Sequence, residues 1–270
     1  MSSASQYMYG QGSEFEYQRL IRQSAIFEAM TRDLLVEAGI GAGMRVLDIG
    51  CGVGEVARLA SELVGTGRVV AVDTDSKALE FARERLAGRN IEFVCSEIAK
   101  YVATERFDAV VGRFILMHLK DPVAVLRHVA RQVRPGGIVC FIEPWHETAM
   151  SYPRVEAFQQ FMEGGFQAMR AAGVHLEMGA SLYSDFVAAG LPAPKLVGVP
   201  QLWGGGQGSE FFDLMLDSAR SGIRATVPEA QQDAVLAQVE ALSHRMRKEA
   251  AEKRATVMMM ITVGARCRLA

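Results

Sequence analysis

The chain has 270 residues, of which 50% are hydrophobic and 22% charged, and this excludes a disordered protein and fits a globular enzyme with one large domain. The formal net charge of −2 shows no basic excess and argues against nucleic acid as a partner. The longest apolar stretch near the C-terminus, residues 257–263, is far shorter than the about 20 residues that cross a bilayer, and the polar N-terminus is unlike a signal peptide, so we expect a cytoplasmic protein without membrane contact.

The first 43 residues predict an arm followed by one helix. Residues 1–16 are rich in glycine and serine, which indicates an irregular arm. Apolar residues then recur at three- and four-residue steps from Leu20 to Ala38, which is typical of a helix with one buried face. Three alternate glycines, the first of them Gly39, end this helix.

Residues 44–150 alternate between short apolar runs and helical segments. The predicted strands are 46–49, 68–72, 91–95, 107–112 and 138–142, and the predicted helices are 55–64, 76–87 and 123–133. Runs of β-branched residues separated by helices of about ten residues predict parallel strands joined by crossover helices.

Residues 151–270 follow a different pattern. The predicted helices are 154–172, 181–189, 210–220 and 228–254, the predicted strands are 195–199 and 258–263, and residues 201–209 form a glycine-rich loop. A last strand that is entered from a long excursion can be inserted antiparallel beside its neighbour. The whole chain therefore predicts an α/β, doubly wound, mostly parallel sheet of seven strands, with a helical cap inserted near the C-terminus.

A glycine-rich turn follows the first strand of this sheet. Gly50, Gly52 and Gly54 occupy alternate positions, so the backbone can turn tightly into a helix and lie against a ligand without interference from a Cβ atom. In the dinucleotide-binding pattern the position after this turn is glycine or alanine, and here it is Glu55. A carboxylate there would repel a pyrophosphate, which argues against NAD but not against a ligand with an amino-acid end.

An acidic residue closes the second strand. Asp73 comes about twenty positions after the glycine turn, where a carboxylate can accept hydrogen bonds from ribose hydroxyls. The alternative is that Asp73 or Asp75 caps the helix that follows. We assign the ribose to Asp73 and favour the capping role for Asp75.

Four sequence blocks together give a resemblance to a known family. They are VLDIGCGVG at 46–54, VVAVDTD at 69–75, FDAVVGRFILMHLKDP at 107–122 and LRHVARQVRPGG at 126–137. In this order and spacing, residues 44–144 resemble the class I, UbiE-like methyltransferase domain of bacterial small-molecule enzymes. The resemblance implies a Rossmann-like fold that uses S-adenosylmethionine and releases S-adenosylhomocysteine, and it makes residues 44–150 the cofactor-binding core.

The resemblance also implies which residues hold the cofactor. Its methionine end is expected against Asp48, Gly50 and Gly52, its ribose on Asp73, and its adenine amino group near Glu97. Backbone carbonyls of Gly112 and Arg113 are expected to meet its ammonium group. The other residues expected to bind the cofactor are Gly54, Thr74 and Ile98. One departure is that Ser96-Glu97 stands where the family usually has Gly-Asp, so Glu97 can instead be a solvated residue at a strand end.

Residues 7–38 resemble the lead-in helix of the same group, which crosses the mouth of the cofactor site. We therefore expect residues 1–43 to form a lid and residues 151–270 to supply substrate-cap helices and the final sheet strands. Aromatic faces attract a sulfonium, so the aromatic residues of this lead-in either cover the cofactor or pack as ordinary contacts; these residues are Tyr7, Tyr9, Phe15 and Tyr17.

The loops after the fourth and fifth strands and the inserted helices should line the substrate pocket, because they surround the carboxyl edge of the sheet. Their aromatic and methionine content favours a flat apolar or aromatic substrate. The residues expected to contact this substrate are Tyr9, Phe114, Met117, Trp145, Phe161 and Trp203.

Two histidines are candidate catalytic residues. A methyl group on a sulfonium is already activated, so a base is needed only where the acceptor must lose a proton. His146 follows the fifth strand, where Glu143 or Glu147 could orient it, and we rank it above His118, which can be purely structural.

The sequence thus predicts methyl transfer to an oxygen, nitrogen or carbon atom of a small aromatic or apolar metabolite. We expect no metal centre, because no cysteine pair has CxxC spacing, and a chain that acts as a monomer or homodimer. The alternatives are a non-catalytic regulatory module that binds S-adenosylmethionine and an NAD-dependent oxidoreductase. A nucleic-acid methyltransferase is disfavoured because the Asn-Pro-Pro-aromatic and Pro-Cys signatures of such enzymes do not occur.

Overall fold

The computed structural model describes residues 9, 12–204 and 209–270. The predicted contacts of Tyr7 and most of the predicted arm lie outside these residues, as does the middle of the glycine-rich loop 201–209. In chain order the structure begins with α1 (Glu14–Ala38), β1 (Arg45–Ile49), α2 (Glu55–Val64), β2 (Arg68–Asp73), α3 (Ser76–Arg85), β3 (Ile91–Cys95), β4 (Phe107–Arg113), the 3-10 helix η1 (Leu116–His118), α4 (Pro122–Ala130) and β5 (Val133–Trp145).

The second part of the chain adds the cap and three more strands. These elements are η2 (His146–Thr148), β6 (Met150–Tyr152), α5 (Glu156–Ala171), α6 (Met178–Ala188), β7 (Lys195–Gly204), α7 (Ser209–Thr226), α8 (Glu229–Glu252) and β8 (Thr256–Arg268). They confirm the predicted order of helices and strands, with β5, β7, β8 and α7 longer than expected.

One sheet runs through the molecule in the order β3-β2-β1-β4-β5-β8-β6, and β7 pairs with β8. Strands β1 to β5 are parallel, and β8 is antiparallel to β5, with Ile138 opposite Arg268 and Trp145 opposite Ile261. The mostly parallel, doubly wound sheet and its antiparallel last strand confirm the predicted fold. The described part of the sheet has eight strands and not seven, because the short β6 pairs with the first residues of β8.

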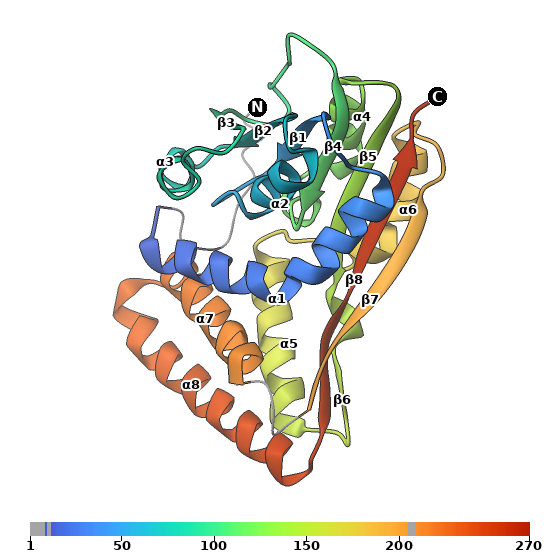
Figure 1. The fold of residues 1–270 in the computed structure, drawn as a ribbon. Coiled ribbons are helices and arrows are strands. Elements are labelled where there is room, and N and C mark those ends of the chain that lie inside the picture. Colours follow the sequence, from blue (N-terminus) through green and yellow to red (C-terminus); the bar gives the residue numbers. More distant parts are fainter. Residues whose placement is uncertain (1–8, 10–11, 205–208) are drawn as a thin grey trace.

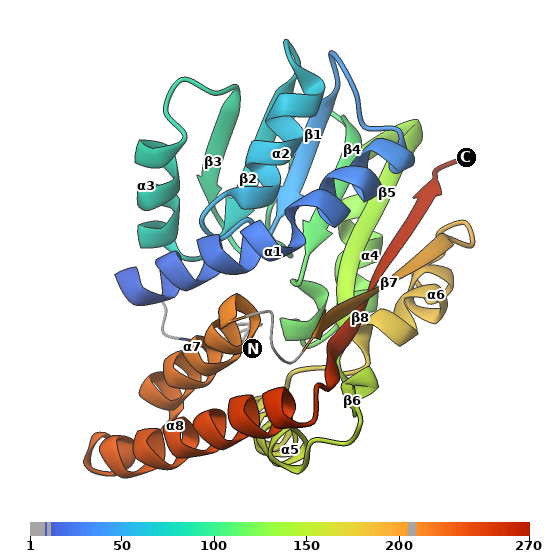
Figure 2. The same cartoon turned by 60° about the horizontal axis from the view of Figure 1, so that its bottom comes forward.

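Helices cover both faces of the sheet (Figure 1). α1 and α2 pack on one face, and α4 and α6 pack on the other. A third group of helices lies beyond the carboxyl ends of the parallel strands: α7 packs on α8 and on α1, and α5 packs on α8 (Figure 2). Since β7 and β8 belong to the same sheet as β1 to β5, the segments 44–150 and 151–270 share one core.

Two central parallel strands, β1 and β2, form from residues that are buried on both faces of the sheet. In β1 and β2 the side chains from Val46 to Ile49 and from Val69 to Val72 are all buried, including Asp48. Continuous burial of this kind is what helices on both faces of a parallel sheet require. Because β1 to β5 run parallel, all five end at one edge, which faces the cap helices.

Candidate cofactor and substrate cavity

A cavity of about 1250 Å³ opens at the carboxyl edge of the parallel strands. Its walls come from the turns after β1, β2, β3 and β4, from α1, and from the cap helices α5, α7 and α8. The volume exceeds the usual range of about 300–1,000 Å³ for a single small-molecule site. The cavity therefore has room for two ligands side by side, one on the strand ends and one toward the cap.

The glycine turn forms the wall of the cavity beyond β1. Gly50 and Gly52 line the cavity and have φ angles of 66° and 51°, a conformation that L side chains rarely adopt. A Cβ atom on Gly50 would lie 2.4 Å from the Ile115 side chain, so this position has room for hydrogen only. The turn thus brings bare backbone to the cavity, as the sequence predicted. Gly54 is the N-cap of α2 and lies off the cavity wall.

Asp73 ends β2 and faces the cavity beside this turn. Its carboxylate accepts hydrogen bonds from the Gly52 N–H at 2.8 Å and the Asp75 N–H at 2.9 Å. Burial raises the pKa of Asp73 above its usual value, and the backbone donors of Asp75, Gly52 and Thr74 oppose that rise. Asp75 caps α3 by accepting from the N–H groups of Lys77 and Ala78, which confirms the capping role favoured from the sequence.

The turn after β3 provides the next part of the wall. Thr74, Glu97 and Ile98 all line the cavity, so the structure brings these predicted cofactor residues together with Asp73. Glu97 also pairs with Lys100 at 2.6 Å on the exposed side of this turn. A carboxylate acceptor and an apolar side chain at this place suit the amino group and the face of a flat, nitrogen-containing ring.

Asp48 is fully buried near the carboxyl end of β1, behind the cavity wall rather than on it. Neither of its carboxylate oxygens has a hydrogen-bond partner among the described residues. Burial raises the pKa of Asp48 to about 8, against an opposing effect from the Arg113 guanidinium. Asp48 therefore does not reach the cavity itself, and it could affect a ligand only by way of the glycine turn that follows it.

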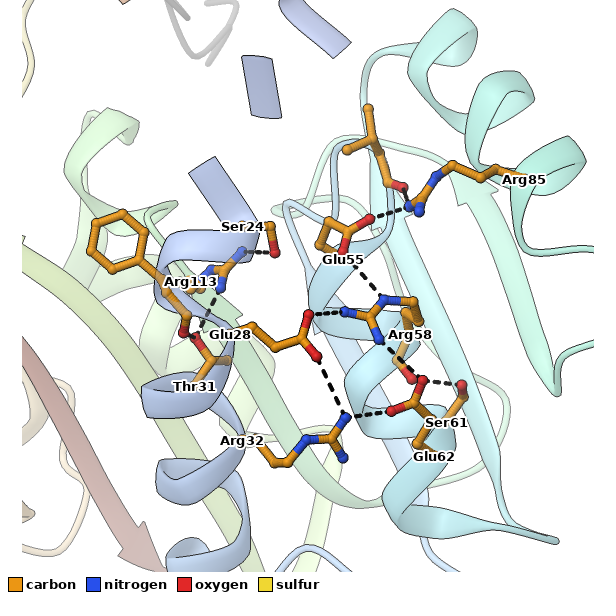
Figure 3. A network of polar contacts seen from close by, with 12 residues as sticks. Ser24, Glu28, Thr31, Arg32, Glu55, Arg58, Ser61, Glu62, Arg85 and Arg113 are labelled. Carbon is orange, nitrogen blue, oxygen red and sulfur yellow. Dashed lines mark hydrogen bonds and ion pairs between the residues drawn. The ribbon is translucent and has the colours of Figure 1, made fainter. Parts of the chain in front are cut away.

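Arg113 ends β4 and fastens α1 to the sheet. Its guanidinium donates to Thr31 Oγ1 at 2.8 Å and Ser24 Oγ at 2.9 Å, both on α1 (Figure 3). The sequence assigned only the backbone carbonyls of Gly112 and Arg113 to the site, and the role of the side chain was missed. Arg113 lines the cavity, whereas Gly112 lies behind it against Phe141.

Charged side chains tie α1 to α2 along the same face. Arg58 of α2 pairs with Glu28 of α1 at 2.5 Å and with Glu55 of its own helix at 3.2 Å, and Glu55 also pairs with Arg85 (Figure 3). Glu55 lines the cavity directly after the glycine turn. The carboxylate that argued against a pyrophosphate therefore lies in an ion-pair network that links the glycine turn to the overlying helix.

The first turns of α1 form the roof of the cavity, next to α7. Glu16 and Arg19 are both buried and form an ion pair at 2.6 Å. Ser221 of α7 donates to Glu16 at 2.6 Å, and Arg19 donates to Ser218 of α7 at 3.2 Å. These contacts were not predicted from the sequence, where Glu16 and Arg19 look like ordinary helix-surface charges.

The predicted aromatic residues of the lead-in take different places. Tyr9 lines the cavity, with Arg19 4.8 Å above its ring centroid, and Tyr17 lines it while donating to Asp75 at 3.2 Å. Phe15 lies against Arg224 of α7, with 4.9 Å between the guanidinium carbon and the ring centroid, and not on the wall. Two of the described aromatics therefore line the cavity and one packs between helices.

Both candidate histidines face the cavity. Burial lowers the pKa of His118 to about 4, and it does the same for His146, where the nearby charge of His118 adds to the effect. The His146 ring lies edge-on to Phe166, and its Nδ1 has no hydrogen-bond partner among the described residues. The predicted orienting carboxylates are wrong: Glu147 is exposed and pairs with Arg170, and Glu143 binds backbone amides of the turn after β4.

The structure separates the predicted substrate residues into two groups. Phe114, Met117 and Phe161 line the cavity together with Tyr9. Trp145 is 37% exposed outside it, because it follows Pro144 on the opposite side of β5. Trp203 stacks on Phe211 at 4.1 Å inside the cap and also lies off the wall. The cap wall is formed mainly by side chains that periodicity alone could not distinguish from core, namely Met162, Phe166, Met169, Met215, Ile223, Val239 and Met259.

No described helix is long and apolar enough to cross a membrane. No group of three or more histidine, cysteine, aspartate or glutamate side chains in the described ranges is placed to hold a metal ion.

Comparison with known proteins identifies the segment that carries the glycine turn and Asp73. Residues 47–141 match the family described as a methyltransferase domain. A ubiquinone biosynthesis O-methyltransferase from Thiobacillus denitrificans is 37% identical over 116 residues, which are 41% of this chain and 48% of that protein. A ubiquinone/menaquinone biosynthesis C-methyltransferase from Pseudomonas putida is 38% identical over 112 residues, 39% of this chain and 44% of that protein. The chain spans about half the length of the curated relatives it matches.

Solved structures resemble the chain over most of its length. A phosphoethanolamine N-methyltransferase from Haemonchus contortus, in complex with phosphomonomethylethanolamine and S-adenosylhomocysteine, superposes with a TM-score of 0.56. The match covers 92% of this chain and 56% of the other, at 17% sequence identity. At this identity the likeness concerns the fold alone.

Proposed function

We propose that this chain, in which residues 47–141 form a class I S-adenosylmethionine-dependent methyltransferase domain, transfers the methyl group of S-adenosylmethionine to a small molecule. One observation carries the proposal: the glycine turn, Asp73 and Glu97 meet on one wall of a cavity that continues into an apolar chamber. When bound, S-adenosylmethionine supplies an activated methyl group on a sulfonium, and S-adenosylhomocysteine is the product.

The residues on the strand-end wall fit this cofactor. Gly50 and Gly52 leave backbone bare for an amino-acid end, and Asp73 offers a carboxylate to ribose hydroxyls. Glu97 and Ile98 suit the adenine amino group and ring face. Glu55 beside the turn disfavours a pyrophosphate, so the NAD-dependent alternative fits these residues less well.

The apolar chamber supports an uncharged aromatic or apolar acceptor. Phe114, Met117 and Phe161 provide flat and adaptable walls, and the Glu16–Arg19 pair in the roof is already hydrogen-bonded to α7. A roofed apolar chamber also argues for a small molecule rather than a nucleic acid. In this proposal residues 1–43 act as the lid, residues 44–150 as the cofactor core, and residues 151–270 as the substrate cap.

His146 and His118 are proposed to contact the acceptor. Imidazoles that stay neutral can accept a hydrogen bond, or a proton, from an acceptor hydroxyl or amine. If His146 acts as a general base, His146→Ala should lower turnover by roughly 10²–10⁴. If it only orients the acceptor, the loss should be smaller and the pH profile unchanged.

Cofactor binding tests the proposal through Asp73. Isothermal titration should detect S-adenosylhomocysteine binding to the wild type, and Asp73→Ala should weaken it by about ten- to a hundredfold, because charge-assisted hydrogen bonds are lost. Asp108→Ala is the matched control: this carboxylate pairs with Arg134 at the opposite edge of the sheet and should leave the affinity unchanged. An unchanged affinity in folded Asp73→Ala protein would reject the ribose assignment, and a wild type that binds NAD but not S-adenosylhomocysteine would reject the proposed function.

A further inference from the structure

Glu143 places a carboxyl group in the interior of the protein, near the end of β5 and away from the cavity wall. Its two oxygens accept three hydrogen bonds, from the N–H groups of Ile115 at 3.0 Å, Leu116 at 2.8 Å and Met117 at 3.3 Å. Burial raises the pKa of Glu143 to about 8, and these backbone donors oppose that rise. Three consecutive amides from one short turn thus converge on a single side chain.

The turn that Glu143 binds, residues 113–118, contains a strained residue. Phe114 has a φ of 56°, which is uncommon for a bulky aromatic residue and persists only where the surroundings hold it. On one side Arg113 is fixed to Ser24 and Thr31 of α1, and on the other side the amides are fixed by Glu143. The Phe114 N–H itself donates to the Ile142 carbonyl at 2.9 Å.

The same turn supplies a large part of the cavity wall. Phe114, Ile115, Met117 and His118 all line it. The Ile115 side chain fills the space that a Cβ on Gly50 would take, so the turn also packs directly against the glycine turn. A change in the position of residues 113–118 would therefore move both the acceptor side and the cofactor side of the cavity.

We propose that Glu143 is a positioning residue for the methyl transfer proposed above: its carboxyl group gathers the amides of Ile115, Leu116 and Met117 and so sets where the turn 113–118 meets both ligands. The inference rests on the proposed function for its catalytic meaning. The geometry of the turn can be tested separately, because it exists without any ligand.

Two variants of Glu143 and one control separate positioning from general stabilisation. Glu143→Leu removes all three acceptors, whereas Glu143→Gln keeps one acceptor oxygen and sets an NH₂ group against a backbone N–H. Gln132→Leu is the control. Gln132 is buried, and its side chain accepts a hydrogen bond from the Ala103 N–H at 2.8 Å, so it also holds a backbone amide of a loop. This contact lies away from the cavity.

The experiment records the ¹³Cε1–¹H signal of His118 in full-length, histidine-labelled protein, assigned with His118→Gln, and the affinity for S-adenosylhomocysteine by calorimetry. Glu143→Leu should shift the His118 signal in the ligand-free protein and lower the affinity for S-adenosylhomocysteine by about five- to tenfold. Glu143→Gln should give smaller changes in the same direction. Gln132→Leu should lower the melting temperature and leave both readouts as in the wild type.

The inference is overturned if folded Glu143→Leu keeps the wild-type signal and affinity, or if Gln132→Leu changes both as much as Glu143→Leu does. If Glu143→Leu does not fold, Glu143→Gln decides by the same criteria. A wild type that binds no S-adenosylhomocysteine would contradict the proposed function instead, and the His118 signal would still show whether Glu143 holds the turn.

Discussion

At the level of single residues, few polar groups face the apolar part of the cavity, and the histidines among them are half-buried on its wall in the uncharged form. Burial lowers the pKa of both His118 and His146 to about 4, so both imidazoles are neutral at physiological pH. A neutral imidazole can accept a hydrogen bond at one of its two nitrogens, which suits an acceptor that carries a hydroxyl or amine proton. Asp48 and Glu143 lie just behind the wall, and there burial raises the pKa of each carboxyl to about 8.

The pKa of His146 predicts a pH-dependent stability that needs no substrate to measure. In the unfolded chain the imidazole has a pKa of about 6.5. Between about pH 4 and 6.5 the unfolded state therefore binds more protons than the folded state. The stabilising contribution of neutral His146 is complete above about pH 6.5 and is lost as the pH falls toward 4. The raised carboxyl pKa values act in the opposite sense, but they are common to wild type and variant.

Melting temperatures of wild type and His146→Phe, measured between pH 5 and 7.5, check this predicted loss of stability at low pH. The melting temperature of the wild type should fall more steeply than that of the variant as the pH is lowered, because the variant lacks the His146 imidazole, whereas the lowered pKa of His118 is common to both proteins. Parallel profiles would mean that His146 meets solvent and would remove the physical basis for its contact with the acceptor.

At the level of elements, α1 is anchored to the elements that surround it. Arg113 anchors it from β4, Arg58 anchors it from α2, and the buried Glu16–Arg19 pair joins it to α7. Arg113 is half-buried between the sheet and α1, so its bonds to the buried Ser24 and Thr31 should hold α1 more strongly than exposed ion pairs do.

Hydrogen exchange measures this anchoring. Arg113→Met should leave the Ser24 hydroxyl unpaired and speed amide exchange across Glu14–Ala38. The matched control on the same helix is Arg22→Ala, which breaks an ion pair with Asp217 in which Arg22 is 51% exposed, and it should change the exchange little. Equal exchange in the two variants would show that Arg113 does not hold the helix.

The elements differ in how far the sequence could predict them. β1 and β2 are continuous apolar runs between turn residues, and both were found because burial on both faces leaves such a run in any chain of this class. β6 was missed because Met150 and Tyr152 are exposed and the strand exists only through pairing with β8, more than one hundred residues later. Trp203 was misplaced for a similar reason: which face of the cap it meets depends on Phe211, and local spacing does not contain that contact.

For the site, the sequence predicted the residues whose roles depend on the backbone and on strand ends. Gly50, Gly52, Asp73 and Glu97 all reached the cavity because parallel strands end at one edge. Glu143 was assigned the wrong partner, because the distance between the ends of β4 and β5 is set by tertiary packing. The role of the Arg113 side chain was missed because its hydroxyl partners lie 82 and 89 residues away.

At the level of the whole molecule, the cavity joins two parts of the chain with different relationships to known proteins. The family match ends at residue 141, and α5, α7 and α8, which enclose the acceptor side, come later. The strand-end wall is thus shared with relatives, whereas the cap wall belongs to the part of the chain that the family match does not cover. We expect the identity of the acceptor to be decided by the cap and the use of the cofactor by residues 47–141.

Transfer of a labelled methyl group is the direct test of the proposed methyltransferase activity. Purified full-length chain is incubated with S-adenosylmethionine that carries a ¹³C methyl group and with an extract rich in uncharged aromatic metabolites, and the products are followed by mass spectrometry. If the chain transfers methyl groups as proposed, S-adenosylhomocysteine and a labelled product should appear together, and Asp73→Ala should reduce both while Asp108→Ala does not. A wild type that does not bind S-adenosylmethionine would contradict the proposed function. So would a wild type that forms S-adenosylhomocysteine no faster than the mixture without protein.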